Sequence, residues 1–470
     1  MALVDKLVLN ARDLPTSLWL LLATASAATL IKVFWRPSIP KNAPKWWKKG
    51  DWPVLGAIRF YSARADFMLE AMKHTPGGNF TFYIGKKQIV AVTGEEGRKT
   101  YFDNRELGFA EGFAELLTGQ PQAPAEMDHF NQWFGKTLNA MLKKGQLYKN
   151  LGSLTGDTRT MFESLGRAQP CAANPEWRTM DPFYHLYRTV YRLTMRTVGA
   201  EEIAEDPNLF EATLENFEKF ESLASTTRVI FPWLPTPNHV RRMYKGARLA
   251  MVFRSIIDKR VATGKTRDDA IQYLIEQGTS FRNTIAFVIG ALFAGLLNSG
   301  INAGWIPIFL AQNPEWKERV RKEVDGVVAK KRKTPDQSPA DVLDTLTIDD
   351  WESEFPLADL CLRESIRFAM PGASFRKNTS GHDIEIGSTG QVIPPNAFAT
   401  YLLDDTHFND EIYSDALRFD PGRFLEGRAE DKKTTHGYLG WGVGRHPCRK
   451  SFFVFSLLLQ MRDSKTRRSN

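Results

Sequence analysis

The stretch Trp441-Gly442-Val443-Gly444-Arg445-His446-Pro447-Cys448 lies near the end of a chain of 470 residues and decides how the rest is interpreted. Glycine and proline make up three of its eight residues, and one cysteine closes it. Glycines let several backbone N–H groups turn toward a single sulfur, which stabilises a thiolate and tunes the potential of a metal bound to it. The same stretch is also typical of a turn before a last helix with an inert, buried cysteine. The preceding sequence has to separate these two interpretations.

A second segment carries a glutamate and an arginine one helical turn apart. It reads Leu362-Arg363-Glu364-Ser365-Ile366-Arg367-Phe368, and we expect a helix that ends before Pro371. Taken alone, Glu364 and Arg367 form an i,i+3 ion pair worth a few tenths of a kcal/mol. Cys361, in the same helix, is expected to be a small core residue.

A third segment, residues 287–310, contains no charged side chain. It is apolar enough to cross a membrane, but Asn298, Asn302 and Pro307 favour a central helix buried in protein. Ala294 and Gly295 in its middle are small, so this helix offers a flat face against which a planar ligand could lie.

The composition is that of an ordinary globular protein, with 43% hydrophobic and 25% charged residues. Disordered, collagen-like and disulfide-stapled chains are therefore excluded. Cys171, Cys361 and Cys448 are too few for a disulfide framework and too scattered for a zinc cluster, which favours a reducing compartment. The net charge of +8 is modest, and the basic residues are not grouped with aromatic ones, so no nucleic-acid partner is expected.

The N-terminal region is typical of a membrane anchor. Residues 14–50 contain no acidic side chain, and residues 18–31 are apolar except for Ser and Thr. We expect residues 1–36 to form a transmembrane helix, residues 37–51 a Pro-rich basic hinge, and residues 52–470 one catalytic domain. Because the basic residues follow the span, the positive-inside rule places that domain in the cytoplasm. A helix lying in the membrane plane is the alternative, while bulky residues 33–35 disfavour a cleaved signal peptide.

The remaining pattern predicts a mainly α fold with small β-sheets. Residues 80–92 are typical of a hairpin. Residues 128–331 show helical spacing, with breaks expected at Gly152, 170–175, 206–207, 232–237 and 263–264. Beyond Phe375 the sequence becomes extended and proline-rich.

Order and spacing together make the chain resemble the cytochromes P450, the haem-thiolate monooxygenases, in their membrane-anchored fungal or microsomal type. The resemblance covers residues 52–448. Four motifs occur in the family's order: Ala294-Gly295, Glu364-Ser365-Ile366-Arg367, Pro421-Gly422-Arg423-Phe424, and the loop that ends at Cys448.

The resemblance implies a single large helical domain that binds haem b, with Cys448 as the iron ligand. It implies that Glu364, Arg367 and Arg423 form a buried charge cluster that supports the cysteine loop. The cofactor-binding residues that it implies are Ala294, Gly295, Arg376, Trp441, Gly444, His446 and Cys448, with His446 and Arg376 contacting the propionates.

The family also implies partners and a location. Electrons would come from NADPH through a cytochrome P450 reductase, and the substrate would be a small lipophilic molecule of sterol, terpenoid, fatty-acid or other secondary-metabolite type. The location would be the endoplasmic-reticulum membrane, with a single span and a cytoplasmic catalytic domain.

Departures from the family pattern leave other functions open. Leu297 and Asn298 stand where the family has an acid and a threonine, so Asn298 and Ser299 become the candidate catalytic residues. This change is also compatible with a reductase-independent isomerase or dehydratase. Lys450 replaces a small residue, and the 22 residues after Cys448 do not resemble the family's longer tail, which suggests an altered gene end or splice form. A truncated, inactive membrane protein is therefore the third interpretation.

Overall fold

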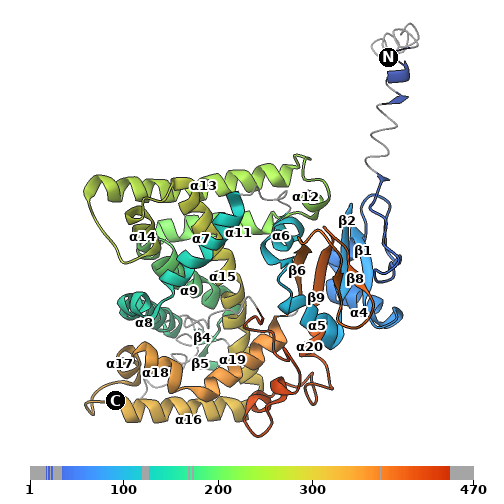
Figure 1. Cartoon of the computed structure of the whole chain (residues 1–470). Coiled ribbons are helices and arrows are strands. Elements are labelled where there is room, and N and C mark those ends of the chain that lie inside the picture. Colours follow the sequence, from blue (N-terminus) through green and yellow to red (C-terminus); the bar gives the residue numbers. More distant parts are fainter. Residues whose placement is uncertain are drawn as a thin grey trace.

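The computed structural model describes residues 34–118, 126–167, 170–171, 174–370 and 372–444, together with positions 17, 19–21, 23 and 24. Helices make up the larger part of this region, and the main sheet lies to one side of them (Figure 1). The mainly α fold with small sheets is thus confirmed. The expected anchor, residues 1–36, and the residues from Arg445 onward lie largely or wholly outside the described residues.

The main sheet has five strands in the order β1-β2-β9-β6-β3. Strands β1 (Phe80–Ile84) and β2 (Lys87–Val92) form the predicted antiparallel hairpin. Strand β9 (Phe398–Leu402) runs parallel to β2, and β6 (Ala373–Asn378) pairs antiparallel with both β9 and β3 (Leu107–Gly108). Two small pairs complete the described strands: β4 (Pro170–Cys171) with β5 (Asn174–Arg178), and β7 (Ile384–Glu385) with β8 (Val392–Ile393).

Helices occur in the predicted periodic segment 128–331 and also before and after it. Those before the central helix are α3 (Arg59–Ser62), α4 (Arg64–His74), α5 (Gly94–Asp103), α6 (Phe109–Phe113), the π-turn η1 (Ala114–Thr118), α7 (Glu126–Met141), α8 (Lys144–Gly166), α9 (Pro182–Val198), α10 (Glu201–Glu205), α11 (Pro207–Ser222), α12 (Thr226–Ile230), α13 (Pro237–Thr263) and α14 (Ala270–Glu276). Those after it are α16 (Pro314–Lys331), α17 (Pro339–Asp344), α18 (Ile348–Ser353), α19 (Pro356–Ala369), α20 (Asp404–His407) and the 3₁₀ turns η2 (Pro421–Phe424) and η3 (Glu430–Lys432).

The break expected at Gly152 is wrong. Helix α8 continues through this glycine, because Leu151 and Leu154 on either side of it are buried in the core. Burial of these leucines outweighs the cost of a glycine in a helix interior, about 1 kcal/mol.

The central helix α15 (Phe281–Gln312) passes through the middle of the molecule (Figure 1). It begins at Ser280, whose hydroxyl accepts the backbone N–H of Asn283. It packs most extensively on α9, where Gly300 and Gly304 lie so close to Tyr187 and Phe183 that a Cβ at either glycine would be 2.6 and 2.5 Å from a ring carbon. Among the described residues, α15 is the helix long and apolar enough to cross a membrane. Its contacts with α9, α16 and α19 instead place it in the centre of the protein, as the sequence predicts, although part of its surface stays open.

The expected hinge is fixed to the sheet. Thr81 donates its N–H to Lys45 O at 2.9 Å, and Trp47 donates to Thr81 O at 2.8 Å. Arg36 pairs with Asp51 at 2.7 Å. Lys45 and Trp47 of the expected hinge are therefore hydrogen-bonded to β1, and Arg36, at the end of the expected anchor, is paired with Asp51.

Candidate active site

One face of α15 is open although the helix is central. Ala294, Asn298 and Ile301 are exposed and spaced i, i+4 and i+7, so they form a stripe along one side of the helix. A Cβ placed on Gly295 would meet no atom within 4 Å. Because the side formed by Gly300 and Gly304 is closed by α9, the space beside Ala294 and Gly295 is where a flat ligand can lie against this helix.

Asn298 and its neighbours give this face its polar groups. The Asn298 side chain is exposed, and its backbone carbonyl accepts a hydrogen bond from the Asn302 amide at 3.0 Å. Asn302 is buried one turn further along the helix. Leu297 and Ser299 are half-buried. Of the two candidate catalytic residues, Asn298 therefore lies on the open stripe, and Ser299 lies beside it.

A buried ion cluster joins α19 to the segment that follows the sheet. Glu364 accepts two hydrogen bonds from Arg367, at 2.9 Å from Nε and 2.8 Å from Nη2. Its Oε1 also accepts Arg423 Nε at 3.0 Å and the backbone N–H of Asp420 at 2.9 Å. The side chains of Glu364, Arg367 and Arg423 are fully buried. The structure thus brings together the three residues for which the family resemblance implies a buried charge cluster.

A second carboxylate, which the sequence reasoning missed, completes the cluster. Glu430 Oε2 lies 2.7 Å from Arg423 Nη1. Burial would raise the pKa of Glu430, but hydrogen bonds from Ser414 and Arg428 and the charges of Arg423 and Arg428 outweigh it and lower this pKa to about 2. The cluster therefore holds two carboxylates against two buried guanidinium groups. No motif marks Glu430, since it lies in an otherwise ordinary charged turn.

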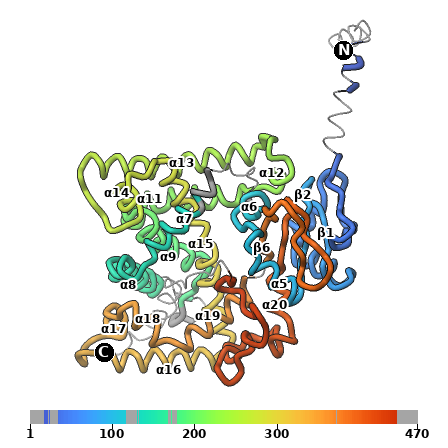
Figure 2. Tube along the Cα trace, in the orientation of Figure 1, coloured from blue at the N-terminus to red at the C-terminus, as the bar shows by residue number. Residues whose placement is uncertain are grey.

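The two arginines also fix the backbone of the loop between β9 and η2. Arg367 donates to the carbonyls of His407, Ala416 and Arg418, and Arg423 donates to those of Ser414, Asp415 and Arg418. Residues 404–444, red in Figure 2, fold against α19 in this way. Burying a guanidinium group without partners would be costly, and here backbone carbonyl oxygens accept the N–H groups that the carboxylates leave free.

The beginning of the cysteine loop rests on this segment. Leu439 donates its N–H to His407 Nε2 at 3.0 Å, and Gly442 donates to Leu439 O at 2.9 Å. The Trp441 ring is half-buried and packs against the core cluster that contains Ile366 of α19. His446 and Cys448 lie outside the described residues.

Gly444 and Arg376 both lie close to the backbone carbonyl oxygen of Phe102. Gly444 has φ +64°, and a Cβ there would lie 2.4 Å from Phe102 O. Arg376 Nη1 lies 3.5 Å from the same oxygen, and its guanidinium stands 4.9 Å from the Tyr101 ring centre. Arg376 extends from β6, where Gly112 of α6 approaches its backbone closely. The structure therefore places Arg376 beside the loop that leads to Cys448.

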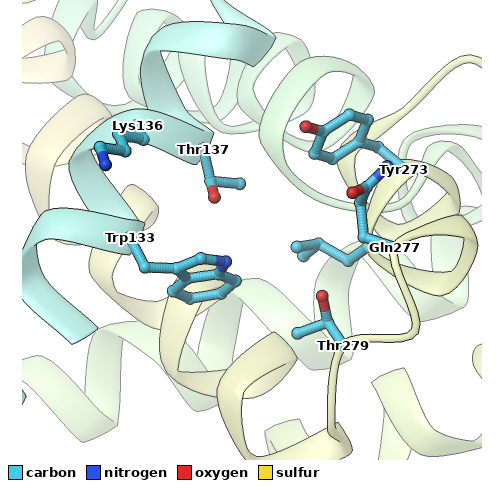
Figure 3. Close-up of a pocket in the computed structure, with 7 residues that line it drawn as sticks. Trp133, Lys136, Thr137, Tyr273, Gln277 and Thr279 are labelled. Carbon is cyan, nitrogen blue, oxygen red and sulfur yellow. The ribbon is translucent and has the colours of Figure 1, made fainter. Parts of the chain in front are cut away.

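A separate hollow of about 280 Å³ lies between α7 and α14 (Figure 3). Trp133 and Thr137 line it from α7, and Tyr273, Gln277 and Thr279 line it from the other side. The Trp133 ring contacts Phe287 of α15, two turns before Ala294. This hollow is therefore distinct from the open stripe, and it contains none of the residues that the sequence singled out.

The long central helix with one open face, the buried Glu-Arg-Arg cluster and the start of the glycine-rich loop beside it are arranged as the resemblance to the haem-thiolate proteins implies. The chain matches the family description "Cytochrome P450" over residues 47–449. It is 31% identical to cytochrome P450 monooxygenase AacuE of Aspergillus aculeatus over 435 residues, which are 90% of this chain and 85% of that protein. It is also 31% identical to cytochrome P450 monooxygenase dmxR5 of Cryptosporiopsis sp. over 88% of this chain and 80% of that protein.

A solved structure shows the same fold. The cyanobacterial protein described as retinoic acid bound CYP120A1 superposes with a TM-score of 0.69 over 90% of this chain and 91% of that one, at 19% identity. The chain belongs to the cytochrome P450 family, and it is an oxidoreductase of the monooxygenase class. The family's cofactor is haem, with NADPH supplying electrons through a reductase. Ala294 is exposed and a Cβ at Gly295 would meet no atom within 4 Å, so this side of α15 fits a flat group that lies against it.

Proposed function

We propose that this protein inserts one oxygen atom from O₂ into a small lipophilic substrate, with electrons passed from NADPH by a membrane-bound reductase. The observation that carries the proposal is the open stripe of α15 at Ala294 and Asn298. It lies in a fold whose buried ion cluster binds His407, which in turn accepts the backbone N–H of Leu439 at the start of the loop toward Cys448. Haem with a thiolate ligand supplies the reductive activation of dioxygen and the cleavage of its O–O bond.

The residues of this chain would hold the cofactor from three directions. Cys448 provides the thiolate, and Ala294 and Gly295 provide the flat wall on the other side. Arg376 would neutralise a propionate, because a guanidinium forms strong charge-assisted hydrogen bonds with a carboxylate, and His446 would donate a hydrogen bond to the other. Trp441 and Gly444 shape the loop. The position of Arg376 next to Gly444, at the same Phe102 oxygen, supports this assignment.

Asn298 and Ser299 would handle protons on the distal side. The Asn298 amide can both donate and accept a hydrogen bond, so it can orient a water molecule or hold an oxygen atom of the substrate. Unlike a carboxylic acid, it cannot itself release a proton. Water ordered by Asn298, with the Ser299 hydroxyl next to it in sequence, would therefore have to carry protons inward.

A second candidate function follows from the same two positions. With Leu297 and Asn298 in place of an acid and a threonine, the distal side suits rearrangement or dehydration of a peroxide or epoxide, which needs no external electrons. The open stripe of α15 and the thiolate loop would be the same in both functions. The two functions differ in whether turnover consumes NADPH.

We further propose that residues 1–36 anchor the protein in the endoplasmic-reticulum membrane by a single span, with residues 52–470 in the cytoplasm. The apolar stretch 18–31 and the basic residues that follow it support this arrangement. A lipid bilayer next to the catalytic domain suits a lipophilic substrate and a membrane-bound reductase.

The deciding experiment uses the full-length protein in detergent or nanodiscs. The dithionite-reduced protein with carbon monoxide should show a strongly red-shifted Soret band, and Cys448→Ser should lose it. An unshifted band in the wild type contradicts thiolate ligation. With the band present, turnover of candidate lipids should require NADPH, reductase and O₂; turnover that needs only a peroxide supports the second candidate instead.

A further inference from the structure

His407 links the buried ion cluster to the start of the cysteine loop. It is the last residue of α20 and is 1% exposed. Its backbone carbonyl accepts a hydrogen bond from Arg367 Nη1, and its Nε2 accepts the backbone N–H of Leu439 at 3.0 Å. One residue therefore contacts the cluster through its main chain and the loop through its side chain.

The hydrogen bond to Leu439 fixes the state of the imidazole. Since Nε2 accepts a hydrogen bond from the Leu439 N–H, it carries no hydrogen, and a neutral histidine ring must then carry its proton on Nδ1. Burial and the charge of Arg367 lower the pKa of His407 to about 3, so the ring is neutral at all ordinary pH values. Among the described residues, Nδ1 is buried without a hydrogen-bond partner. The imidazole therefore uses its acceptor, Nε2, for the Leu439 N–H, while its donor, the Nδ1 N–H, makes no hydrogen bond among the described residues.

The surrounding packing holds the ring in place. His407 stacks on Tyr438, with ring centres 5.7 Å apart and planes 27° apart. Tyr438 in turn donates its hydroxyl to Arg363 O on α19 at 3.1 Å. Directly after Leu439, a Cβ at Gly440 would lie 2.4 Å from an Ile366 carbon, so the loop passes close to α19 at this point. The position of the Leu439 N–H is thus determined by rigid neighbours on both sides.

We propose that His407 is a positioning residue for the haem-binding loop: it accepts the Leu439 N–H and thereby sets where the chain leaves toward Cys448. This rests on the proposed haem-thiolate function. A loop that carries a thiolate ligand must hold its sulfur within a fraction of an ångström, because a supporting hydrogen bond tunes both ligation and potential. The buried arginine cluster supplies the rigid base, and His407 connects it to the loop.

Three substitutions of His407 separate the acceptor from simple packing. Glutamine has its Oε1 the same number of bonds from Cα as Nε2 is in histidine, so His407→Gln keeps an acceptor for Leu439. In asparagine the amide corresponds to Nδ1 instead, so His407→Asn loses that acceptor. His407→Phe keeps a ring to stack on Tyr438 but has no acceptor.

The matched control is Asn79→Ala. Asn79 is 2% exposed, and its Oδ1 accepts the backbone N–H of Thr93 at 2.9 Å, so the variant removes a hydrogen bond of the same kind at similar burial. It also removes the bond from the Asn79 amide to Gln391 at 2.9 Å, so it perturbs the structure at least as much. The bond to Thr93 lies between the sheet and the beginning of α5, away from Leu439.

The readouts are the fraction of reduced, CO-bound protein with the red-shifted Soret band, its conversion to the unshifted form during incubation, the Fe(III)/Fe(II) potential, and the hydrogen exchange of the Leu439 amide. We expect His407→Asn and His407→Phe to convert about tenfold faster than the wild type, with a shifted potential and faster Leu439 exchange. His407→Gln should stay within about twofold. Asn79→Ala should lower the unfolding temperature without changing the band, the potential or the Leu439 exchange.

Several results would overturn the positioning role. The first is hydrogen exchange of the Leu439 amide in His407→Phe at the same rate as in the wild type. The second is a His407→Gln variant that loses the red-shifted band as fast as His407→Asn, or that fails to fold, because packing rather than the acceptor would then matter. A third is Asn79→Ala reproducing the spectral change. A wild type that lacks the red-shifted band contradicts the proposed function instead, and the Leu439 exchange still tests His407 in that case.

Discussion

Arg423 Nε lies 3.0 Å from Glu364 Oε1, although the two residues are 59 positions apart in the sequence, and both side chains are fully buried. Arg367 shares the same carboxylate from one turn away on α19. The carboxylate thus holds two guanidinium groups at fixed positions, and these groups hold the carbonyls of the segment from His407 to Arg418. Removing the carboxylate affects more than one ion pair, since each arginine would keep its charge in the protein interior.

Glu364→Gln should therefore be strongly destabilising. The amide keeps the size of the side chain but leaves Arg367 without a buried counter-ion, which costs roughly 3 to 5 kcal/mol. We expect a lower denaturant midpoint and a haem content well below one per chain. Glu352→Gln is the control, since its ion pair with Lys144 is about half exposed and should contribute less than about 1 kcal/mol. Equal effects of the two substitutions would contradict the role of burial in the cluster.

Gly444→Ala tests whether the loop depends on its close approach to Phe102. A Cβ at Gly444 would lie 2.4 Å from Phe102 O, so either the loop or α5 would have to move. Gly264 at the end of α13 has nearly the same backbone conformation, with φ +65°, but a Cβ there would meet nothing within 4 Å. Gly264→Ala should therefore cost only the conformational strain, about 1 kcal/mol.

Thermal unfolding and haem content measure the difference between these two variants. Gly444→Ala should lower both more than Gly264→Ala does, because it adds a steric clash to the strain. If the two variants behave alike, the contact with Phe102 does not constrain the loop.

The order of four short motifs made the family resemblance recognisable, and that resemblance implied the fold and the grouping of Glu364, Arg367 and Arg423. The partners that complete the site carried no such signal. His407 ends the short helix α20 and Glu430 begins the short 3₁₀ helix η3. The local sequence at both positions resembles any polar surface, and their burial follows from how the chain folds back on α19. The helix through Gly152 was missed for a related reason, since local propensity does not report the burial of Leu151 and Leu154.

Asp404 should make stability depend on pH in a direction opposite to that of most carboxylates. Burial raises its pKa to about 6, against the opposing effect of the backbone N–H groups of Gly372 and Asp404 itself. The unfolded chain has the ordinary value of about 3.9. The folded state therefore favours the protonated acid, and the stability that this provides is fully present below about pH 4 and is lost as the pH rises to about 6.

Asp404→Asn removes this titration. Above pH 6 the variant should be more stable than the wild type by about 1 to 2 kcal/mol, a value reduced for the partial exposure of the group. Below pH 4 the two proteins should have the same unfolding free energy. Denaturant unfolding at pH 4, 5, 6 and 7.5 measures the difference. A difference that is constant with pH would show that Asp404 is ionised equally in both states.

Asn298→Thr tests the distal residue that separates the two candidate functions. Asn298 lies on the open stripe of α15, and threonine there would supply a hydroxyl that can pass a proton as well as order water. For a monooxygenase we expect less hydrogen peroxide released per NADPH consumed, by a factor of about two to ten, with product formation rising accordingly. Asn283→Thr, exposed in the first turn of the same helix, controls for the effect of placing a β-branched residue in this helix. Peroxide release unchanged by Asn298→Thr would remove Asn298 from proton delivery, whereas turnover that never consumes NADPH in either protein would leave rearrangement as the reaction of this site.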